Sequence, residues 1–88
     1  MAKYEATTGR MCFATALDCL KRGSRVARTG WNGKGMWVEL QTPDTHSKMT
    51  LPYLYLSYPK DAANTPGARV PWLASQTDLL AEDWVEVF

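Results

Sequence analysis

Two segments of the chain alternate between aliphatic side chains and aromatic or polar ones, and this alternation constrains the fold more than any other feature. The segments are 36–41 (MWVELQ) and 53–58 (YLYLSY). Because successive side chains of a strand point to opposite faces, each segment predicts a strand with one aliphatic face. The aliphatic faces carry Met36, Val38, Leu40, Leu54 and Leu56, and the opposite faces carry Trp37, Glu39, Gln41, Tyr53, Tyr55 and Ser57. The aliphatic face needs a covering layer.

A helix near the N-terminus is predicted to provide that layer. Apolar residues at i, i+3, i+4 and i+7 predict an amphipathic helix over Met11–Arg22. Thr7 or Thr8 could cap its start, and Gly23 stands where a left-handed residue commonly ends a helix. The residues of the apolar stripe are Phe13, Ala16, Leu17 and Leu20.

Shorter signals complete the predicted order of elements. The sequence 75–78 (SQTD) resembles a capping box, with Asp in place of the usual Glu, and predicts a helical turn through Ala81. The pair 32–33 (NG) favours a tight turn because both residues tolerate positive φ angles. Three more segments are predicted to be extended, 24–28, 69–72 and 84–88, and two polar segments with proline to be loops, 42–50 and 59–67.

These elements predict an α+β fold in one small domain, residues 1–88. An antiparallel β-sheet carries one main helix packed on one face, and a short second helix lies near the C-terminus. Two independent cores would not fit in a chain of 88 residues.

The charge of the chain is nearly balanced but unevenly distributed. A net charge of +1 argues against binding of long nucleic acid through bulk charge. Arg28 could pair with one of the acidic residues near the C-terminus, so the basic segment is either a solvated, paired surface or a local site for a small anion. The basic segment contains Lys21, Arg22, Arg25, Arg28 and Lys34, and the acidic residues are Asp78, Glu82, Asp83 and Glu86.

No constellation for catalysis or metal binding stands out. His46 is the only histidine, and together with Cys12 and Cys19 it provides too few ligands for a metal. We predict that both cysteines are buried, reduced thiols. The glycine-rich segment 30–35 (GWNGKG) is not a P-loop, because Met36 follows it. We therefore expect a protein that is not an enzyme, with no catalytic residues, no metal and no cofactor.

The N-terminal residues do not resemble a signal peptide, because Lys3, Glu5 and Arg10 interrupt them before an apolar run develops. No segment approaches the roughly 20 apolar residues that cross a bilayer. We therefore expect a cytoplasmic protein that does not bind membranes.

The aromatic residues Trp37, Tyr53 and Tyr55 raise a question about the second face of the sheet. A monomer rarely exposes so large an aromatic surface to water. Three interpretations remain open: the face is a subunit interface, it is a stacking platform for bases or a peptide, or the segment 59–72 covers it.

Three blocks of the chain resemble a family of small phage proteins, the Thoeris anti-defence sponges. The blocks are 20–28 (LKRGSRVAR), 30–36 (GWNGKGM) and 70–84 (VPWLASQTDLLAEDW), and the resemblance extends over Phe13–Val87. The last block is long enough to be specific, whereas the middle of the chain, 41–67, is less informative.

This resemblance implies a phage protein that binds a signal and does not degrade it. Members sequester cyclic ADP-ribose isomers, such as glycocyclic ADP-ribose, that bacterial TIR-domain proteins make during infection. Some members form hexamers and also hold cyclic di- or trinucleotides of the CBASS pathway. The resemblance implies the host cytoplasm as the location and a homodimer as the minimal unit, with a hexamer as the alternative. It implies no contact with long nucleic acid or membrane.

The resemblance also indicates which residues would bind the ligand. Trp31 would line the pocket beside the glycine turn, and Arg69 would stack on adenine or pair with phosphate. Tyr53 or Tyr55 would supply a second aromatic ring, and Lys34 suits an oligonucleotide site between subunits. The remaining candidates for ligand contacts are Arg28, Ser75, Gln76, Thr77 and Asp78.

Each of these assignments has a structural alternative. Asp78 could simply cap a helix, and Trp72 and Trp84 are predicted to belong to the core rather than to the site. Two other functions also remain open: an aromatic-faced module that binds nucleic acid or peptide, and a purely structural oligomeric phage protein.

Overall fold

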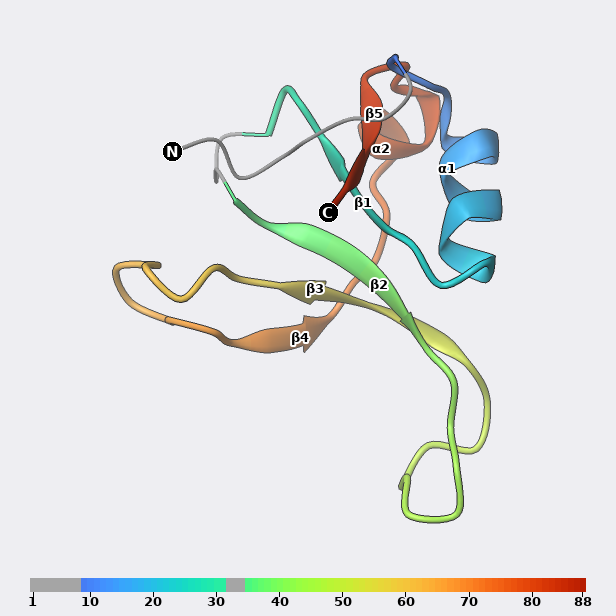
Figure 1. The fold of residues 1–88 in the computed structure, drawn as a ribbon, viewed down its shortest axis with the longest axis vertical. Coiled ribbons are helices and arrows are strands. Elements are labelled where there is room, and N and C mark those ends of the chain that lie inside the picture. The colour runs from blue at the N-terminus through green and yellow to red at the C-terminus, as the bar shows by residue number, and fades with distance from the viewer. Residues whose placement is uncertain (1–8, 32–34) are drawn as a thin grey trace.

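A five-stranded antiparallel sheet organises residues 9–31 and 35–88, the part of the chain that the computed structural model describes. The strands lie in the order β4-β3-β2-β1-β5, so β5 returns to pair with β1 (Figure 1). The predicted antiparallel sheet is confirmed, while the expected turn at 32–33 lies outside the described residues. The strands are β1 (Arg25–Arg28), β2 (Trp37–Gln41), β3 (Tyr53–Ser57), β4 (Arg69–Pro71) and β5 (Trp84–Val87).

The main helix, α1 (Phe13–Lys21), packs against β1, β2 and β5 (Figure 1). It begins two residues later than predicted, because Cys12 is the N-cap and has an extended conformation, with φ −77° and ψ 169°. Thr7 and Thr8, which we expected to cap the helix, lie outside the described residues. Gly23 has φ +94° and ends the helix as predicted, since glycine adopts this left-handed conformation without strain.

The prediction that both cysteines are buried is right for Cys19 and wrong for Cys12. Cys19 faces the core from α1, whereas Cys12 is exposed. The seven-residue spacing would place the two thiols on one face only if both belonged to the helix. Cys12 precedes the first helical turn, so its side chain does not follow the buried stripe.

Trp84 is the largest wholly buried side chain among the described residues, and other aromatic rings surround it. Its ring centroid lies 5.3 Å from that of Phe13, 5.4 Å from that of Trp31 and 5.9 Å from that of Trp72. These rings meet at tilted or edge-to-face angles, which aromatic pairs favour. Trp72 and Trp84 are therefore core residues, as predicted.

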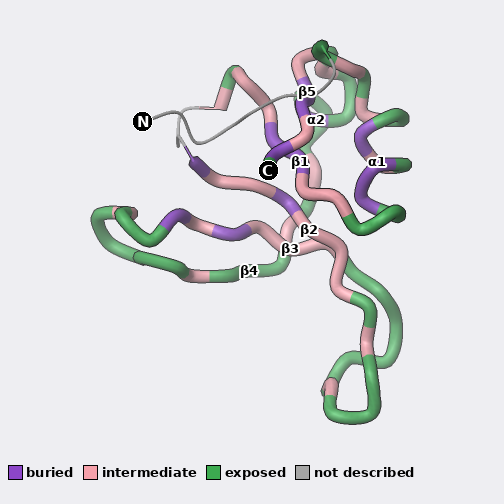
Figure 2. Tube along the Cα trace, in the orientation of Figure 1, coloured by how far each residue is buried: buried purple, intermediate pink, exposed green. Residues whose placement is uncertain are grey.

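The alternation in β2 and β3 sets their register. Val38 pairs with Leu56 on the helix side, and Glu39 pairs with Tyr55 on the opposite side. The pair β3 and β4 extends away from α1, which leaves Leu56 only half-buried (Figure 2). The segment 42–52 between β2 and β3 projects from the body and is mostly exposed (Figures 1 and 2).

The second helix, α2 (Gln76–Leu80), is short, as expected. Ser75 is its N-cap and accepts a hydrogen bond from the backbone N–H of Asp78, while the Asp78 carboxylate accepts one from the backbone N–H of Ser75. The predicted capping box with Asp is thus present. It places Asp78 where it can reach β1 and the turn before β5.

We expect Leu20→Ala to lower the free energy of unfolding by about 3 kcal/mol. Leu20 is wholly buried between α1 and the sheet, so its removal leaves a cavity. Urea denaturation followed by circular dichroism measures the change. Thr15→Ala, at an exposed position of the same helix, should alter the stability by less than about 0.5 kcal/mol. Equal effects of the two substitutions would contradict this description of the core.

Candidate ligand-binding site

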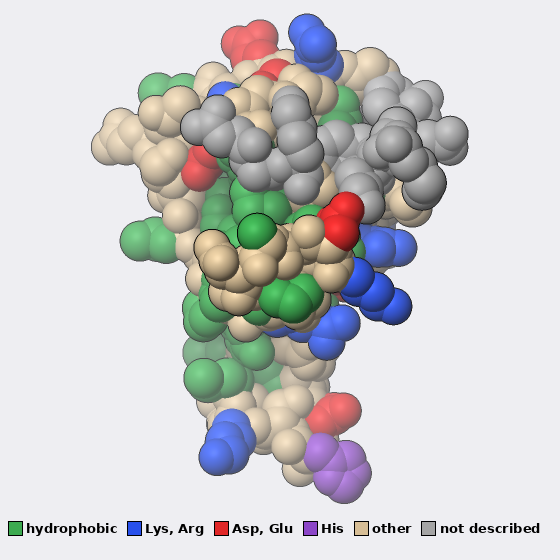
Figure 3. Space-filling model, turned by 90° about the vertical axis from the view of Figure 1, so that its left-hand side faces the viewer, with side chains coloured by type: hydrophobic (Ala, Val, Ile, Leu, Met, Phe, Trp, Pro, Cys, Tyr) green, Lys and Arg blue, Asp and Glu red, His purple; other side chains and the backbone are tan. Residues whose placement is uncertain are grey.

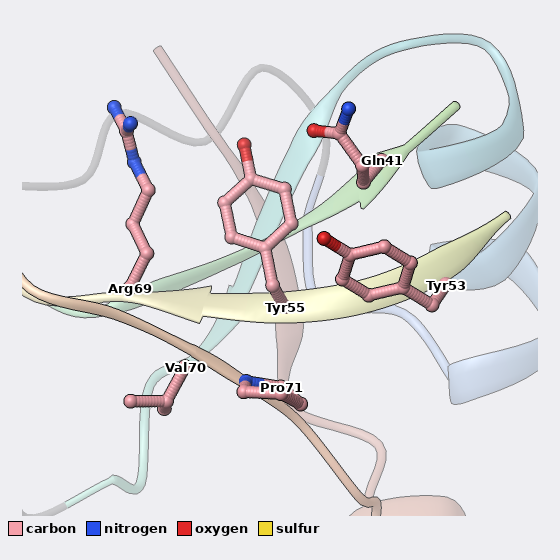
Figure 4. Close-up of a pocket in the computed structure, with 6 residues that line it drawn as sticks. All are labelled: Gln41, Tyr53, Tyr55, Arg69, Val70 and Pro71. Carbon is pink, nitrogen blue, oxygen red and sulfur yellow. The ribbon is translucent and has the colours of Figure 1, made fainter. Parts of the chain in front are cut away.

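The sheet face opposite α1 carries a small open pocket of about 150 Å³ over β2, β3 and β4 (Figure 4). Arg69, Tyr55, Tyr53 and Gln41 project to the same side of the sheet, whereas Val70 points the other way. The pocket therefore combines aromatic surface, a guanidinium group and an amide. Its described lining consists of Gln41, Tyr53, Tyr55, Arg69, Val70 and Pro71.

Strand register explains why these residues meet. On β3, Tyr53 and Tyr55 are two positions apart, so they share a face, and their ring centroids lie 6.5 Å apart at an angle of 56°. Gln41 on β2 pairs with Tyr53, and Arg69 on β4 pairs with Ser57. The amide and the guanidinium group therefore stand at opposite ends of the tyrosine pair.

A chain of polar contacts continues from the pocket across the sheet. The Trp37 indole N–H donates a hydrogen bond of 2.6 Å to Glu39 Oε2, and the Arg25 guanidinium lies 5.2 Å from the centre of the Trp37 ring. Burial and, next, the charge of Glu39 raise the pKa of Tyr55. The Tyr55 hydroxyl therefore stays protonated at neutral pH and can donate a hydrogen bond.

A second, more apolar hollow of about 440 Å³ adjoins the first and shares Tyr53 and Pro71 with it. Its other walls come from the projecting segment, where Met49 is 57% exposed and Leu51 is 75% exposed. In Figure 3, hydrophobic side chains extend down towards this segment, while Lys and Arg side chains gather to one side. The second hollow thus extends the pocket with mainly apolar surface.

Ser57 lies on the same face as the tyrosines but is almost completely buried. It pairs with Trp37 on one neighbouring strand and with Arg69 on the other. Within the described part of the chain its hydroxyl oxygen has no hydrogen-bond partner, which is costly for a buried polar group. The burial of Ser57 could not be predicted from alternation, because a serine at an alternating position usually faces water.

Four of the predicted site residues meet elsewhere, on the helix side of the sheet. Arg28 donates from Nη1 to Asp78 Oδ1 at 3.0 Å, and the Trp31 indole N–H donates to the same oxygen at 3.3 Å. Ser75 holds the other carboxylate oxygen of Asp78 through its backbone N–H at 3.1 Å. The Asp78 carboxylate is therefore fully engaged by its own chain.

Asp83 completes this cluster from the turn before β5. Its carboxylate accepts from Arg28 Nε at 2.9 Å and from the Gly30 backbone N–H at 2.8 Å. A Cβ at Gly30 would lie 2.8 Å from Asp83 Oδ2, so a larger residue at this position would push the Asp83 carboxylate away from the Gly30 backbone N–H. Arg28 thus pairs with two C-terminal acids, which was the structural alternative to ligand binding.

At both carboxylates of this cluster, hydrogen bonds lower the pKa by more than burial raises it. Burial alone would raise the pKa of Asp78, but the Ser75 backbone N–H and the Arg28 guanidinium hold it below its ordinary value. Burial likewise opposes ionisation of Asp83, while Arg28 and the Gly30 backbone N–H lower its pKa overall. Both groups are therefore charged at neutral pH.

The predicted site residues fall into separate groups. Tyr53, Tyr55 and Arg69 line the pocket, while the cluster around Asp78 lies on the other side of the sheet. Lys34 lies outside the described residues. Outside the pocket are Arg28, Trp31, Ser75 and Asp78 in the cluster, and Gln76 and Thr77 at exposed positions of α2.

Sequence reasoning missed Gln41, Val70 and Pro71 as pocket residues. Gln41 could have been found, because the alternation of β2 already places it on the aromatic face. Pro71 could not, since its position depends on the pairing of β4 with β3. This pairing also rules out a cover made of 59–72, because β4 extends the sheet edgewise and leaves the pocket open.

Within residues 9–31 and 35–88, no group of three or more His, Cys, Asp or Glu side chains could hold a metal ion. Neither of the helices that the structure describes is long and apolar enough to cross a lipid bilayer.

Comparison with known proteins gives two agreeing results. Residues 11–87 match the family described as the Thoeris anti-defense 2-like domain. The chain is also similar to a protein of Bacillus phage SP01 called Thoeris anti-defense 2, with 40% identity over 85 residues. That alignment covers 85% of this chain and 92% of the phage SP01 protein.

We expect the stability of the protein to fall in acid because of the Arg28 cluster. Asp78 and Asp83 have lowered pKa values when folded, so their contribution is fully present above the unfolded value of about 3.9. It is lost as the pH falls through the lower folded values. Arg28→Met should cost about 3 kcal/mol at pH 7 and flatten the loss of stability between about pH 5 and pH 2.

Urea denaturation across this pH range measures the effect. The matched control is Arg22→Met, because Arg22 is exposed and its guanidinium contacts Cys19 Sγ rather than a carboxylate. The control should keep the pH dependence of the unaltered protein. The same flattening in both variants would show that the cluster does not cause it.

Proposed function

This chain belongs to the Thoeris anti-defense 2-like family, and on that premise we propose that it binds and sequesters cyclic ADP-ribose isomers without degrading them. The proposed ligands include glycocyclic ADP-ribose made by bacterial TIR-domain proteins. The observation that carries the proposal is the open pocket in which two tyrosine rings stand beside Arg69.

The chemistry of the pocket suits a cyclic ADP-ribose, which combines one adenine base with a diphosphate. Adenine has an aromatic face that can stack on Tyr53 or Tyr55, and such stacking contributes about 1–3 kcal/mol per base. The diphosphate is anionic, and the planar guanidinium group of Arg69 can make paired, charge-assisted hydrogen bonds to it. Arg69 is exposed, so its guanidinium is available to a ligand.

Several observations support binding rather than turnover. The described residues that line the pocket include no histidine, cysteine or carboxylate, the usual acids, bases and nucleophiles. Tyr55 is the lining residue whose pKa is raised, so its hydroxyl is a poor base at neutral pH. Sequestration needs only affinity, which concentrates in a few aromatic and arginine contacts.

The proposal extends to where the protein acts and to related ligands. The signal is made inside the infected bacterium, so sequestration would take place in the host cytoplasm. Cyclic di- and trinucleotides of the CBASS pathway also combine bases with phosphates, and the same contacts would serve them. Competition with glycocyclic ADP-ribose would decide whether the two classes share the pocket.

We expect the protein to be an oligomer with a homodimer as its minimal unit. Met49 and Leu51 expose apolar surface in the projecting segment beside the pocket, and a second copy would cover it. Multi-angle light scattering at micromolar concentration should return at least twice the 9.9 kDa mass of one chain. A hexamer would appear as six times this mass, and a monomer would contradict the expectation.

We expect Arg69→Ala to weaken binding of glycocyclic ADP-ribose by about 30- to 1,000-fold, because the diphosphate loses its cation. Calorimetric titration measures the affinity. The ligand released from the unaltered protein by heating should be recovered intact, which chromatography of the supernatant checks.

Arg22→Ala is the matched control, since it removes an exposed arginine that does not line the pocket. It should bind like the unaltered protein. Equal affinities of folded Arg69→Ala and Arg22→Ala would remove Arg69 from the site. Recovery of a hydrolysed product would contradict sequestration, and failure of the unaltered protein to bind would contradict the proposed function itself.

A further inference from the structure

One side chain that lines the pocket, Gln41, has no role in the proposed stacking of the base or in the proposed pairing of the diphosphate with Arg69. Among the described residues that line the pocket, it alone carries a side-chain amide. An amide presents a donor and an acceptor side by side in one plane, whereas a tyrosine hydroxyl rotates and a guanidinium only donates. Gln41 is therefore suited to distinguish one base edge from another.

The position of Gln41 separates it from the cation of the pocket. It pairs with Tyr53 at one end of β3, and Arg69 pairs with Ser57 at the other end. Positions 53 and 57 are four steps apart along the strand, which is about 13 Å. Figure 4 shows Gln41 beside Tyr53, and Arg69 on the far side of Tyr55. A base at the Gln41 end would leave the diphosphate free to reach Arg69.

A contact with the backbone orients the amide. Gln41 Nε2 donates to the carbonyl oxygen of Thr42 at 3.4 Å, a long hydrogen bond. A carbonyl oxygen can only accept, so this contact favours the rotamer in which Nε2 faces Thr42. The amide oxygen Oε1 and the second hydrogen of Nε2 then remain for a ligand.

We propose that Gln41 is the specificity-determining residue of the pocket and selects adenine over bases with an oxygen at the same position. This inference rests on the proposed function. Adenine has an amino donor next to a ring-nitrogen acceptor, and glutamine pairs with both at once. Oε1 accepts from the amino group while Nε2 donates to the ring nitrogen.

Hypoxanthine does not fit the same arrangement. Its carbonyl oxygen replaces the amino group and would face Oε1, so two acceptors would oppose each other. On the edge that contains the imidazole nitrogen, both base atoms are acceptors, and the amide can satisfy only one of them. On the other edge, the amide would have to turn over and place Oε1 against the carbonyl of Thr42. On the first edge the base loses one hydrogen bond, and on the second edge Gln41 loses its hydrogen bond to Thr42.

The test compares glycocyclic ADP-ribose with the same compound in which hypoxanthine replaces adenine. Ring closure between the two riboses leaves the base edges free in both probes. The unaltered protein should bind the adenine compound about 10- to 100-fold more tightly in calorimetric titration. Gln41→Met, similar in size but without the amide, should weaken adenine binding and bring this ratio close to one.

Asn64→Leu is the matched control, because it removes an exposed amide from a loop residue that does not line the pocket. It should keep the ratio of the unaltered protein. Gln41→Leu is a second neutral replacement, to be used if Gln41→Met does not fold. Circular dichroism checks the folding of both variants.

The outcomes separate this inference from the proposed function. A ratio retained by folded Gln41→Met or Gln41→Leu would overturn the role of Gln41 while the pocket remains a binding site. Equal affinity of the unaltered protein for both probes would also overturn the role of Gln41 and leave the pocket as a binding site. Binding of neither probe would overturn the proposed function and this inference together.

Discussion

Arg28 lies between two carboxylates, and the arrangement of the C-terminal third depends on this contact. Its guanidinium joins β1 to Asp78 in α2 and to Asp83 in the turn before β5, at 3.0 and 2.9 Å. The same region holds the Trp84 indole N–H, which donates to the backbone oxygen of Asp78 at 3.0 Å. Removal of Arg28 would leave the buried Asp78 and the half-buried Asp83 without their cation, beside the aromatic core.

This cluster determines which residues remain available for a ligand. Arg28, Trp31 and Asp78 carry the groups that bind nucleotides, but here their polar atoms contact one another. On the opposite face, Arg69 and the tyrosines have open surroundings. The sheet thus separates a structural side from an open side, and we propose that the ligand binds on the open side, over β3 and β4.

The sequence predicted the sheet, its alternation and both helices, because those depend on local periodicity and capping. It also placed Gln41, Tyr53 and Tyr55 on one face. It could not show that β4 pairs with β3, and this long-range register brings Arg69 to the tyrosines. Trp31 was predicted to line the pocket, but its indole contacts Asp78 and Trp84 instead. These contacts depend on tertiary packing and could not be predicted from the sequence. Cys12 is exposed because the helix begins after it, at Phe13, and periodicity alone did not predict that starting point.

Assignment of the binding side to β3 and β4 is the central claim, and backbone amide chemical shifts test it directly. Titration of the isotope-labelled protein with glycocyclic ADP-ribose should shift the amide signals of Gln41, Tyr53, Tyr55 and Arg69 most strongly. The indole signal of Trp31 should change little, because its N–H already bonds to Asp78. The largest shifts at Trp31 and at 75–78, with β3 and β4 unaffected, would contradict the account.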